Sequence, residues 1–509
     1  MPALATDEWS ITSRWQNGDE LPGVNINVFN FNWSTVAGDT EFTAWVSDFS
    51  ENPLTALTPD SEITKVYDSD TDVDNSPHKL DLTLSVSASK LGDSGPNSGI
   101  GLAVNAFTAN FSGVGTFYAL WDTETLGLTS LEELGRTGLP LADGELYQSP
   151  SASYTSEGTV CLTNQMITTD VGLGLYCGHP ALAELLEPVT KAGDENPVIG
   201  EIQFVTQPSL SRLGAAYQAG GQNGNAVLYR LFNFRSPKRD GDTTPQLVTE
   251  IGNTALKRPS QVEIDGEANI IWQEQDQQGQ TRFRRIKVGE TLSSVLAESG
   301  EPLDDGDAIV DIASIFPFVG TSIGTDVCVF YQAFRASAPF PIGDLHLAVT
   351  CEATDGSKTT DIVFSYGQMV DGETISSIEI WPDSADGARI VFKGFTATGG
   401  EVLLVATQES DSDGDGLPDA TDNCTAVANA DQRDSNADGI GNACDADLTD
   451  DCAVNFEDLG AMKAEFFTAD DDADLNGDGS VNFTDLGIMK EGFFAPPGPS
   501  GVPNICDGS

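Results

Sequence analysis

The chain has 509 residues, more than one hydrophobic core usually organises, so we expect at least two structural units. Lys and Arg total 24 against 79 Asp and Glu, which gives a formal charge of -55. That excess excludes nucleic acids and anionic membranes as expected partners, because both are bound through clustered cations, and it favours cations as ligands.

A repeated strand pattern occupies most of the chain. Through residues 8–408, pairs of strand-like runs joined by a polar or glycine-containing turn recur at starts roughly 54 to 63 residues apart. The first runs begin at Glu41, Gly101, Thr159, Leu213, Asn269, Asp326 and Arg389. A period in this range with several short strands per unit is typical of propeller blades. We therefore predict an all-β, seven-bladed β-propeller over residues 1–408, with two β-sandwiches as the alternative.

These repeats resemble the propeller-like surface proteins of Gram-negative bacteria, which share the loose motif G-apolar-V-x-F-x-A. The resemblance implies a fold and no activity. The three histidines, His78, His179 and His346, form no metal-binding pattern, and no G-x-S-x-G, P-loop or HExxH motif is present. The sequence therefore predicts no catalytic residues.

Eight cysteines fall in local pairs along the chain, which predicts disulfides, with buried free thiols as the alternative. The expected pairs are Cys161 with Cys177, Cys328 with Cys351, Cys424 with Cys444, and Cys452 with Cys506. The first two pairs hold nearly the same place in the third and sixth repeats, so we expect each to staple the inner hairpin of its blade. Disulfides form in oxidising compartments. We expect a secreted or surface protein whose start, MPALATDEWS, is a mature N-terminus with an added Met.

A local positive face interrupts the acidic chain. The run RFRRIKV alternates, which predicts Arg282 and Arg284 on one strand face and Arg285 and Lys287 on the other. This face is a candidate acceptor for an acidic polysaccharide or for the acidic tail of a neighbouring copy. The alternative is a solvated edge that discourages pairing between sheets.

Two twelve-residue loops with regular spacing follow Ser410. Each places oxygen-bearing side chains at positions 1, 3, 5, 9 and 12 and glycine at position 6, which is the pattern of a Ca²⁺ loop. The predicted ligands, including a backbone carbonyl at position 7, are Asp411, Asp413, Asp415, Leu417, Asp419 and Asp422, then Asp434, Asn436, Asp438, Ile440, Asn442 and Asp445. These loops resemble thrombospondin type 3 repeats, and we assign residues 409–446 to them. The resemblance implies the disulfide between Cys424 and Cys444.

The last segment, residues 447–509, duplicates a loop followed by a helix: VNFEDLGAMKAEFF and VNFTDLGIMKEGFF. The predicted calcium ligands are Asp447, Thr449, Asp451, Ala453, Asn455 and Asp458, then Asp474, Asn476, Asp478, Ser480, Asn482 and Asp485. The duplication resembles a type I dockerin, an EF-hand-like module, and implies docking onto a cohesin domain. The first copy departs from the pattern at Thr449 and at Cys452, which replaces the turn glycine. Loop positions 10 and 11, where dockerin specificity resides, are Phe456 and Glu457, then Phe483 and Thr484.

Four Ca²⁺ ions would offset part of the charge of the last hundred residues, which carry about 20 excess negative charges. We therefore expect a secreted, calcium-binding surface or matrix protein that mediates adhesion or assembly through a cohesin-like partner or another copy of itself. One alternative is an extracellular polysaccharide-binding propeller anchored by its tail, and a less favoured one is a polysaccharide hydrolase or lyase. For the last module, a calcium-stapled cap with no partner is the alternative.

Overall fold

The fold is taken from a computed structural model. It describes residues 9–16, 30–37, 40–46, 54–57, 63–67, 71–74, 76, 79–91, 99–108, 114–122, 125–138, 141, 146–147, 153–156, 159–164, 171–178, 186–211, 213–231, 246–252, 258–275, 280–300, 302–303, 308–313, 317–335, 345–408, 412–413, 415, 417–419 and 421–506. The chain divides into two compact units, a large one of residues 11–406 and a second made mainly of residues 407–509.

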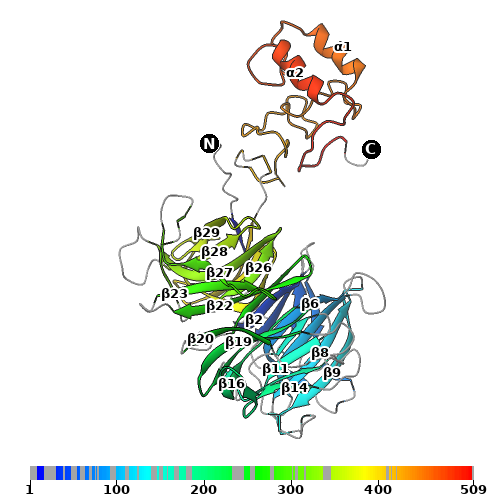
Figure 1. The fold of residues 1–509 in the computed structure, drawn as a ribbon. Coiled ribbons are helices and arrows are strands. Elements are labelled where there is room, and N and C mark those ends of the chain that lie inside the picture. The colour runs from blue at the N-terminus through cyan, green and yellow to red at the C-terminus, as the bar shows by residue number, and fades with distance from the viewer. Residues whose placement is uncertain are drawn as a thin grey trace. The chain divides into compact units, whose positions relative to one another are not determined.

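The large unit consists of β-sheets that follow one another along the chain (Figure 1). Blade 1 contains β2 (Asn30–Ala37), β3 (Thr40–Val46), β4 (Leu54–Leu57) and β5 (Ile63–Tyr67). Blade 2 contains β6 (Leu80–Leu91), β7 (Gly99–Thr108), β8 (Val114–Asp122) and β9 (Gly127–Arg136). Blade 3 contains β10 (Ser153–Ser156), β11 (Thr159–Thr163), β13 (Gly174–Gly178) and β14 (Glu187–Lys191). Blade 4 contains β12 (Val171–Gly172), β15 (Glu195–Asn196), β16 (Gly200–Thr206), β17 (Ser209–Ser211), β18 (Gly214–Gly221), β19 (Gly224–Leu231) and β20 (Gln246–Gly252).

The remaining three sheets complete the set of seven. Blade 5 contains β21 (Ser260–Ile264), β22 (Glu267–Gln275), β23 (Thr281–Lys287) and β24 (Ser294–Glu298). Blade 6 contains β25 (Ile309–Ile312), β26 (Val319–Ile323), β27 (Asp326–Arg335), β28 (Leu345–Glu352) and β29 (Lys358–Ser365). Blade 7 contains β30 (Met369–Val370), β31 (Glu373–Asp386), β32 (Arg389–Thr396), β33 (Glu401–Gln408) and β1 (Trp9–Gln16).

The seven sheets form a closed ring. The strands β2, β6, β10, β17, β21, β26 and β31 each contact the corresponding strand of the next sheet, and β31 contacts β2. The ring is sealed in blade 7, where β1 from the start of the chain pairs with β33. The predicted seven-bladed β-propeller is therefore confirmed.

Apolar side chains fill the space between neighbouring blades. Phe42 of β3 and Trp121 of β8 meet edge to face across blades 1 and 2, with ring centroids 6.4 Å apart. Phe283 of β23 packs on Tyr331 of β27 across blades 5 and 6, with centroids 5.2 Å apart. Because both faces of a blade are covered in this way, its central strands read as nearly continuous apolar runs, which is why the repeats are visible in the sequence.

Six of the predicted repeat starts lie in β3, β7, β11, β22, β27 and β32, and the seventh, Leu213, directly precedes β18. Each of these strands lies in the middle of its sheet and is not the strand that lines the ring. The bridges Cys161–Cys177 and Cys328–Cys351 are present between directly opposed residues of β11 and β13 and of β27 and β28. Each bridge therefore links the two middle strands of its blade. The prediction that the bridges link the inner hairpin was wrong. The ring-lining strands were missed because several are short or interrupted and lack the apolar pattern of the middle strands.

One side chain links blades that are far apart in sequence. Asp383, in the irregular part of β31, accepts hydrogen bonds from Arg258 at 2.8 Å and from Ser87 of β6 at 3.0 Å. Its backbone carbonyl accepts from Thr35 of β2 at 2.7 Å. The residue has a positive φ of 60°, a conformation that Asp tolerates better than most residues. Asp383 thus ties blades 1, 2 and 7 to the segment before blade 5.

The C-terminal unit contains two short helices, α1 (Phe456–Ala464) and α2 (Phe483–Glu491) (Figure 1). Met462 and Met489 are fully buried in a small apolar core with Val454, Leu475 and Val481. Leu459, Phe466, Leu486 and Phe493, which the sequence pattern places on the apolar helix faces, pack against this core. Among the described residues, no helix has the length and apolar character needed to cross a membrane.

Candidate calcium sites

The loop at residues 474–485 is organised around its first and last carboxylates. Asp474 accepts hydrogen bonds from the backbone N–H groups of Asp478, at 3.2 Å, and Gly479, at 2.8 Å. Asp485 accepts from the N–H of Asn476 at 3.1 Å. These bonds fold the chain around the oxygens at positions 1 and 12, as a cation loop requires.

The loop at residues 447–458 has the same geometry despite its departures in sequence. Asp447 accepts from the N–H groups of Asp451, at 3.2 Å, and Cys452, at 2.5 Å. Asp458 accepts from the N–H and the hydroxyl of Thr449, at 3.0 and 2.8 Å. One carboxylate oxygen each from Asp447, Asp451 and Asp458 lies within 4.8 Å of the others. The first copy thus brings three of its predicted ligand positions together.

Both loops run directly into helices. Asn455 and Asn482 are the N-cap residues of α1 and α2, and Asp458 and Asp485 complete a capping box at the third helical position. The last ligand position therefore lies at a helix N-terminus, where free N–H groups and the helix dipole stabilise a carboxylate.

The loop at residues 411–422 holds a buried carboxylate that lacks a full set of partners. Asp422 is 1% exposed, and its Oδ1 accepts from the N–H of Cys424 at 2.8 Å and from Gln432 at 2.7 Å. Its Oδ2 is buried and has no hydrogen-bond partner among the residues that the structure describes. Oxygens of Asp413, Asp415 and Asp422 lie within 4.8 Å of one another. A buried, unpaired carboxylate oxygen facing two further carboxylates fits a divalent cation.

The other predicted positions of this loop lie around it. Asp419 accepts from the N–H and hydroxyl of Ser412 at 2.8 and 2.7 Å. The N–H of Leu417 donates to Asp415 at 3.0 Å. The carbonyl of Leu417 remains the predicted ligand at position 7. Asp411 lies outside the described residues, as do His78 and His179.

The loop at residues 434–445 repeats this arrangement. Asp434 accepts from the N–H groups of Ala437 and Gly439 at 2.7 and 3.1 Å, and Asp438 accepts from that of Ile440 at 2.8 Å. Asn442 accepts from the N–H of Ser435 at 2.8 Å, as Asp419 does from Ser412. The loops at residues 411–422 and 434–445 therefore share two hydrogen bonds at equivalent positions.

Negative charge accumulates where this loop meets the next. Burial, followed by repulsion from the carboxylates of Asp438, Asp447 and Asp472, raises the pKa of Asp445 to about 8. Burial and the neighbouring Asp434 also raise the pKa of Asp438. An added cation would relieve this repulsion.

Two acidic residues that sequence reasoning did not select belong to this cluster. Asp450 accepts from the side-chain amide of Asn436 at 3.0 Å, and Asp472 accepts from the hydroxyl of Ser435 at 2.9 Å. Burial raises the pKa of Asp472 as well. Both residues stand next to other aspartates in the sequence. Their spacing therefore does not distinguish them from those neighbours.

The end of the chain, residues 496–506, forms a strap over the loops. The N–H of Gly501 donates to the Asp422 carbonyl at 2.8 Å, and that of Ile505 to the Asp438 carbonyl at 2.9 Å. The predicted disulfides Cys424–Cys444 and Cys452–Cys506 are present, and the second joins the strap to the loop at residues 447–458. The strap therefore connects three of the four loops.

Exposed aromatic side chains form two similar clusters on this unit. Phe456 contacts Phe493 and Phe494, with centroids 5.3 and 5.7 Å away. Phe483 contacts Phe466 and Phe467 at 5.1 and 6.3 Å. Phe456 and Phe483, at position 10 of their loops, are 70% and 72% exposed. Both are thus available to a partner surface.

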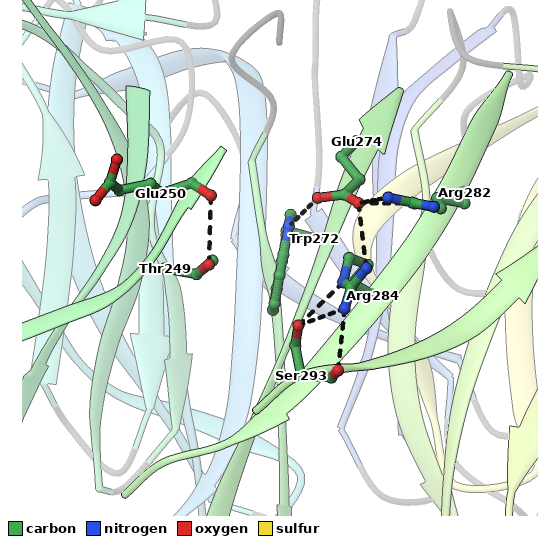
Figure 2. Close-up of polar contacts among 7 residues, drawn as sticks. All are labelled: Thr249, Glu250, Trp272, Glu274, Arg282, Arg284 and Ser293. Carbon is green, nitrogen blue, oxygen red and sulfur yellow. Dashed lines mark hydrogen bonds and ion pairs between the residues drawn. The ribbon is translucent and has the colours of Figure 1, made fainter. Parts of the chain in front are cut away.

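The basic strand of the propeller is paired with carboxylates, as Figure 2 shows for two of its arginines. Arg282 and Arg284 both reach Glu274 of β22, with N–O distances of 2.6 and 3.6 Å, and Trp272 donates to the same carboxylate. Arg284 also donates to the hydroxyl of Ser293 at 2.7 Å. The two arginines share one strand face, as predicted.

The other two cations of this strand also have acidic neighbours. Arg285 lies 3.2 Å from Glu352 of β28, and Lys287 pairs with Glu267 of β22. Because β23 is flanked by β22 and β24, it is not an edge strand, so the alternative interpretation as a protected edge was wrong. Binding of an acidic partner here would compete with these ion pairs and stays a prediction.

His346, the histidine that the structure describes, lies in β28 with Nδ1 2.9 Å from the Ser365 hydroxyl. It is largely buried, which suits a structural role.

The chain matches no family model and no curated protein. Solved structures do match. An ancestral GH74 enzyme is 9% identical with a TM-score of 0.42, and the match covers 79% of this chain and 51% of that chain. The Dos1 propeller is 10% identical with a TM-score of 0.37, covering 75% and 81%. A mutant of the Aleuria aurantia lectin is 9% identical with a TM-score of 0.33, covering 67% and 95%. This chain spans about half the length of the GH74 enzyme, and these distant propellers, an enzyme and a lectin among them, do not indicate what it binds.

Proposed function

We propose that this protein binds calcium through the four loops of its C-terminal unit and that the loaded unit docks the propeller onto a protein partner outside the cell. The observation that carries the calcium part is Oδ2 of Asp422, buried without a hydrogen-bond partner among the described residues and close to Asp413 and Asp415. A carboxylate oxygen in that position is costly unless a cation pairs with it.

The remaining loops support the same chemistry. Ca²⁺ takes six to eight oxygen ligands, and each loop offers carboxylates, side-chain amides or a hydroxyl, and a backbone carbonyl. Four ions would add eight positive charges to a segment with about 20 excess negative charges. Calcium would thus organise the unit by replacing repulsion between carboxylates with shared coordination.

The docking part rests on the exposed aromatic clusters around Phe456 and Phe483. Large exposed aromatic side chains favour a protein interface. Two copies of so acidic a chain would repel each other, which favours a different protein as the partner. The resemblance to dockerins makes a cohesin-like domain the partner that we propose.

Export from the cell is supported by the cysteines. Four disulfides join all eight cysteines, and such bonds persist in oxidising environments. The same environment supplies calcium at concentrations that weak loops can use.

Calcium titration of the full chain tests the first part. We expect native mass spectrometry and calorimetry to count four bound ions, and Asp422→Asn to weaken one site by about tenfold or more, since it removes a buried charged ligand. Asp355→Asn, at an exposed turn of the propeller, is the matched control and should change nothing. A wild-type chain that takes up no calcium at millimolar concentration would overturn the proposal.

A purified type I cohesin domain is the probe for docking. We expect binding in calcium, loss of binding with EDTA, and about tenfold weaker binding for Phe456→Ala with Phe483→Ala. Leu292→Ala, at an exposed residue of the propeller, is the control. No cohesin binding together with calcium-dependent growth in mass by light scattering would instead make a second copy the partner.

A further inference from the structure

The first dockerin-like loop turns at residues that are not glycine. Cys452 has a φ of 64°, where the second loop has Gly479 with a φ of 90°. Asp450 has a φ of 58°, where the second loop has Gly477 with a φ of 70°. Glycine adopts this left-handed region freely, whereas a residue with a Cβ atom is disfavoured there.

The left-handed turn matters to the ligand beside it. In both loops the N–H at position 6 donates to the carboxylate at position 1: Cys452 to Asp447 at 2.5 Å, and Gly479 to Asp474 at 2.8 Å. If residue 452 relaxed to a negative φ, its N–H would point elsewhere and Asp447 would lose the bond that orients it. The conformation of residue 452 therefore controls a predicted calcium ligand.

Cys452 is held in place by a strap that is itself anchored. Its disulfide partner Cys506 follows Ile505, whose N–H donates to the Asp438 carbonyl at 2.9 Å. Both sulfur atoms lie within 4.8 Å of a carboxylate oxygen of Asp447. The disulfide thus sits beside the position-1 ligand and fixes the residue that orients it.

We propose that the Cys452–Cys506 disulfide sets the calcium affinity of the loop at residues 447–458, by holding a residue with a Cβ atom in the left-handed turn. The inference rests on the proposed calcium binding and adds its regulation by oxidation. A dithiol reductant would supply two electrons and two protons, become a disulfide itself and leave two cysteine thiols. Residue 452 would then relax and the loop would release its ion, while the loop at residues 474–485, which turns at glycines, would keep its own.

Two double variants of the full chain separate the disulfide from the Cβ atom. Cys452→Ala with Cys506→Ser removes the bridge and keeps the Cβ, and we expect one calcium site to weaken by about tenfold. Cys452→Gly with Cys506→Ser removes the bridge but permits the turn, and should bind within about twofold of wild type. Wild type treated with dithiothreitol should resemble the alanine variant at this site. The readouts are calorimetry and the number of bound ions counted by native mass spectrometry.

The outcomes distinguish this inference from the proposed function. If wild type binds no calcium, the proposed function fails. If wild type binds four ions and the alanine variant binds them equally tightly, or if both variants weaken alike, the proposed function stands and this inference is overturned. Hydrogen exchange of α1 and α2 reports whether each variant is folded. If the alanine variant unfolds, the glycine variant, which also lacks the disulfide, is compared with wild type instead.

Discussion

The propeller and the C-terminal unit are stabilised by different physical means. Between the blades, large side chains such as Trp121, Tyr217 and Tyr331 are buried against apolar neighbours. In the C-terminal unit the apolar core is small, and the carboxylates of Asp422, Asp458 and Asp485 are nearly or fully buried instead. The first kind of burial is favourable in water without any ligand, whereas the second is costly unless protons, N–H groups or cations compensate the charge. We infer that the propeller is stable without any ligand, whereas the stability of the C-terminal unit depends on the pH and on the cations in solution.

Removing calcium should produce the largest difference in stability between the two units. With EDTA at a pH of about 8 or above, where the buried carboxylates are charged, we expect residues 421–506 to lose nearly all protection from hydrogen exchange, because uncompensated carboxylates repel one another. The strands of the propeller should keep their protection, which serves as the internal control. Unchanged exchange in the C-terminal unit would show that its disulfides and small core suffice without the ion.

Truncating a buried aromatic side chain should affect only the propeller. Trp121→Ala leaves a cavity beside Phe42, and we expect it to lower the free energy of unfolding of the propeller by about 3–5 kcal/mol. Leu292→Ala, at a side chain that is 82% exposed, should stay within about 0.5 kcal/mol. Thermal or urea denaturation measures both, and calcium affinity should be the same in both variants. A weaker calcium site in Trp121→Ala would contradict the independence of the two units.

The smallest expected effect is a pH dependence of the calcium-free C-terminal unit. Burial raises the pKa of Asp445 from 3.8 to about 8, so between these values the folded unit binds more protons than the unfolded chain. The contribution of Asp445 to the stability of the unit is therefore fully present below about pH 4 and is lost as the pH rises through about 8. Denaturation at several pH values in EDTA measures the slope, and Asp445→Asn should flatten it. A stability that rises with pH in this range would refute the assignment.

Local patterns predicted the propeller because its middle strands are buried on both faces. The runs at Glu41 and Arg389 mark β3 and β32 correctly, since continuous apolar residues and the turns between them are visible in the sequence. The strand β1, which seals the ring, was not predicted, because its partner β33 lies at the other end of the propeller. Pairing over that distance leaves no local trace.

The loops show the same division. Their spacing predicts that Asp422 and Asp485 belong to calcium-binding loops, which stays a prediction. The helices that follow the last two loops are where the sequence places them. Asp450 and Asp472 were missed, because only the fold brings them to Asn436 and Ser435. That Cys452 adopts the conformation of a glycine was likewise not readable from its identity.

By itself, the sequence determined the features that depend on neighbours along the chain: the strand repeats, the regular spacing of carboxylates in the loops, the two helices and the local cysteine pairs. The tertiary structure alone decided which strands line the ring, how Asp383 joins distant blades and how the strap crosses three loops. It also buries Oδ2 of Asp422 where no described residue donates a hydrogen bond to it. The physical reason is that periodicity and spacing encode short-range geometry, whereas burial and charge repulsion are set by residues that meet only when the chain has folded.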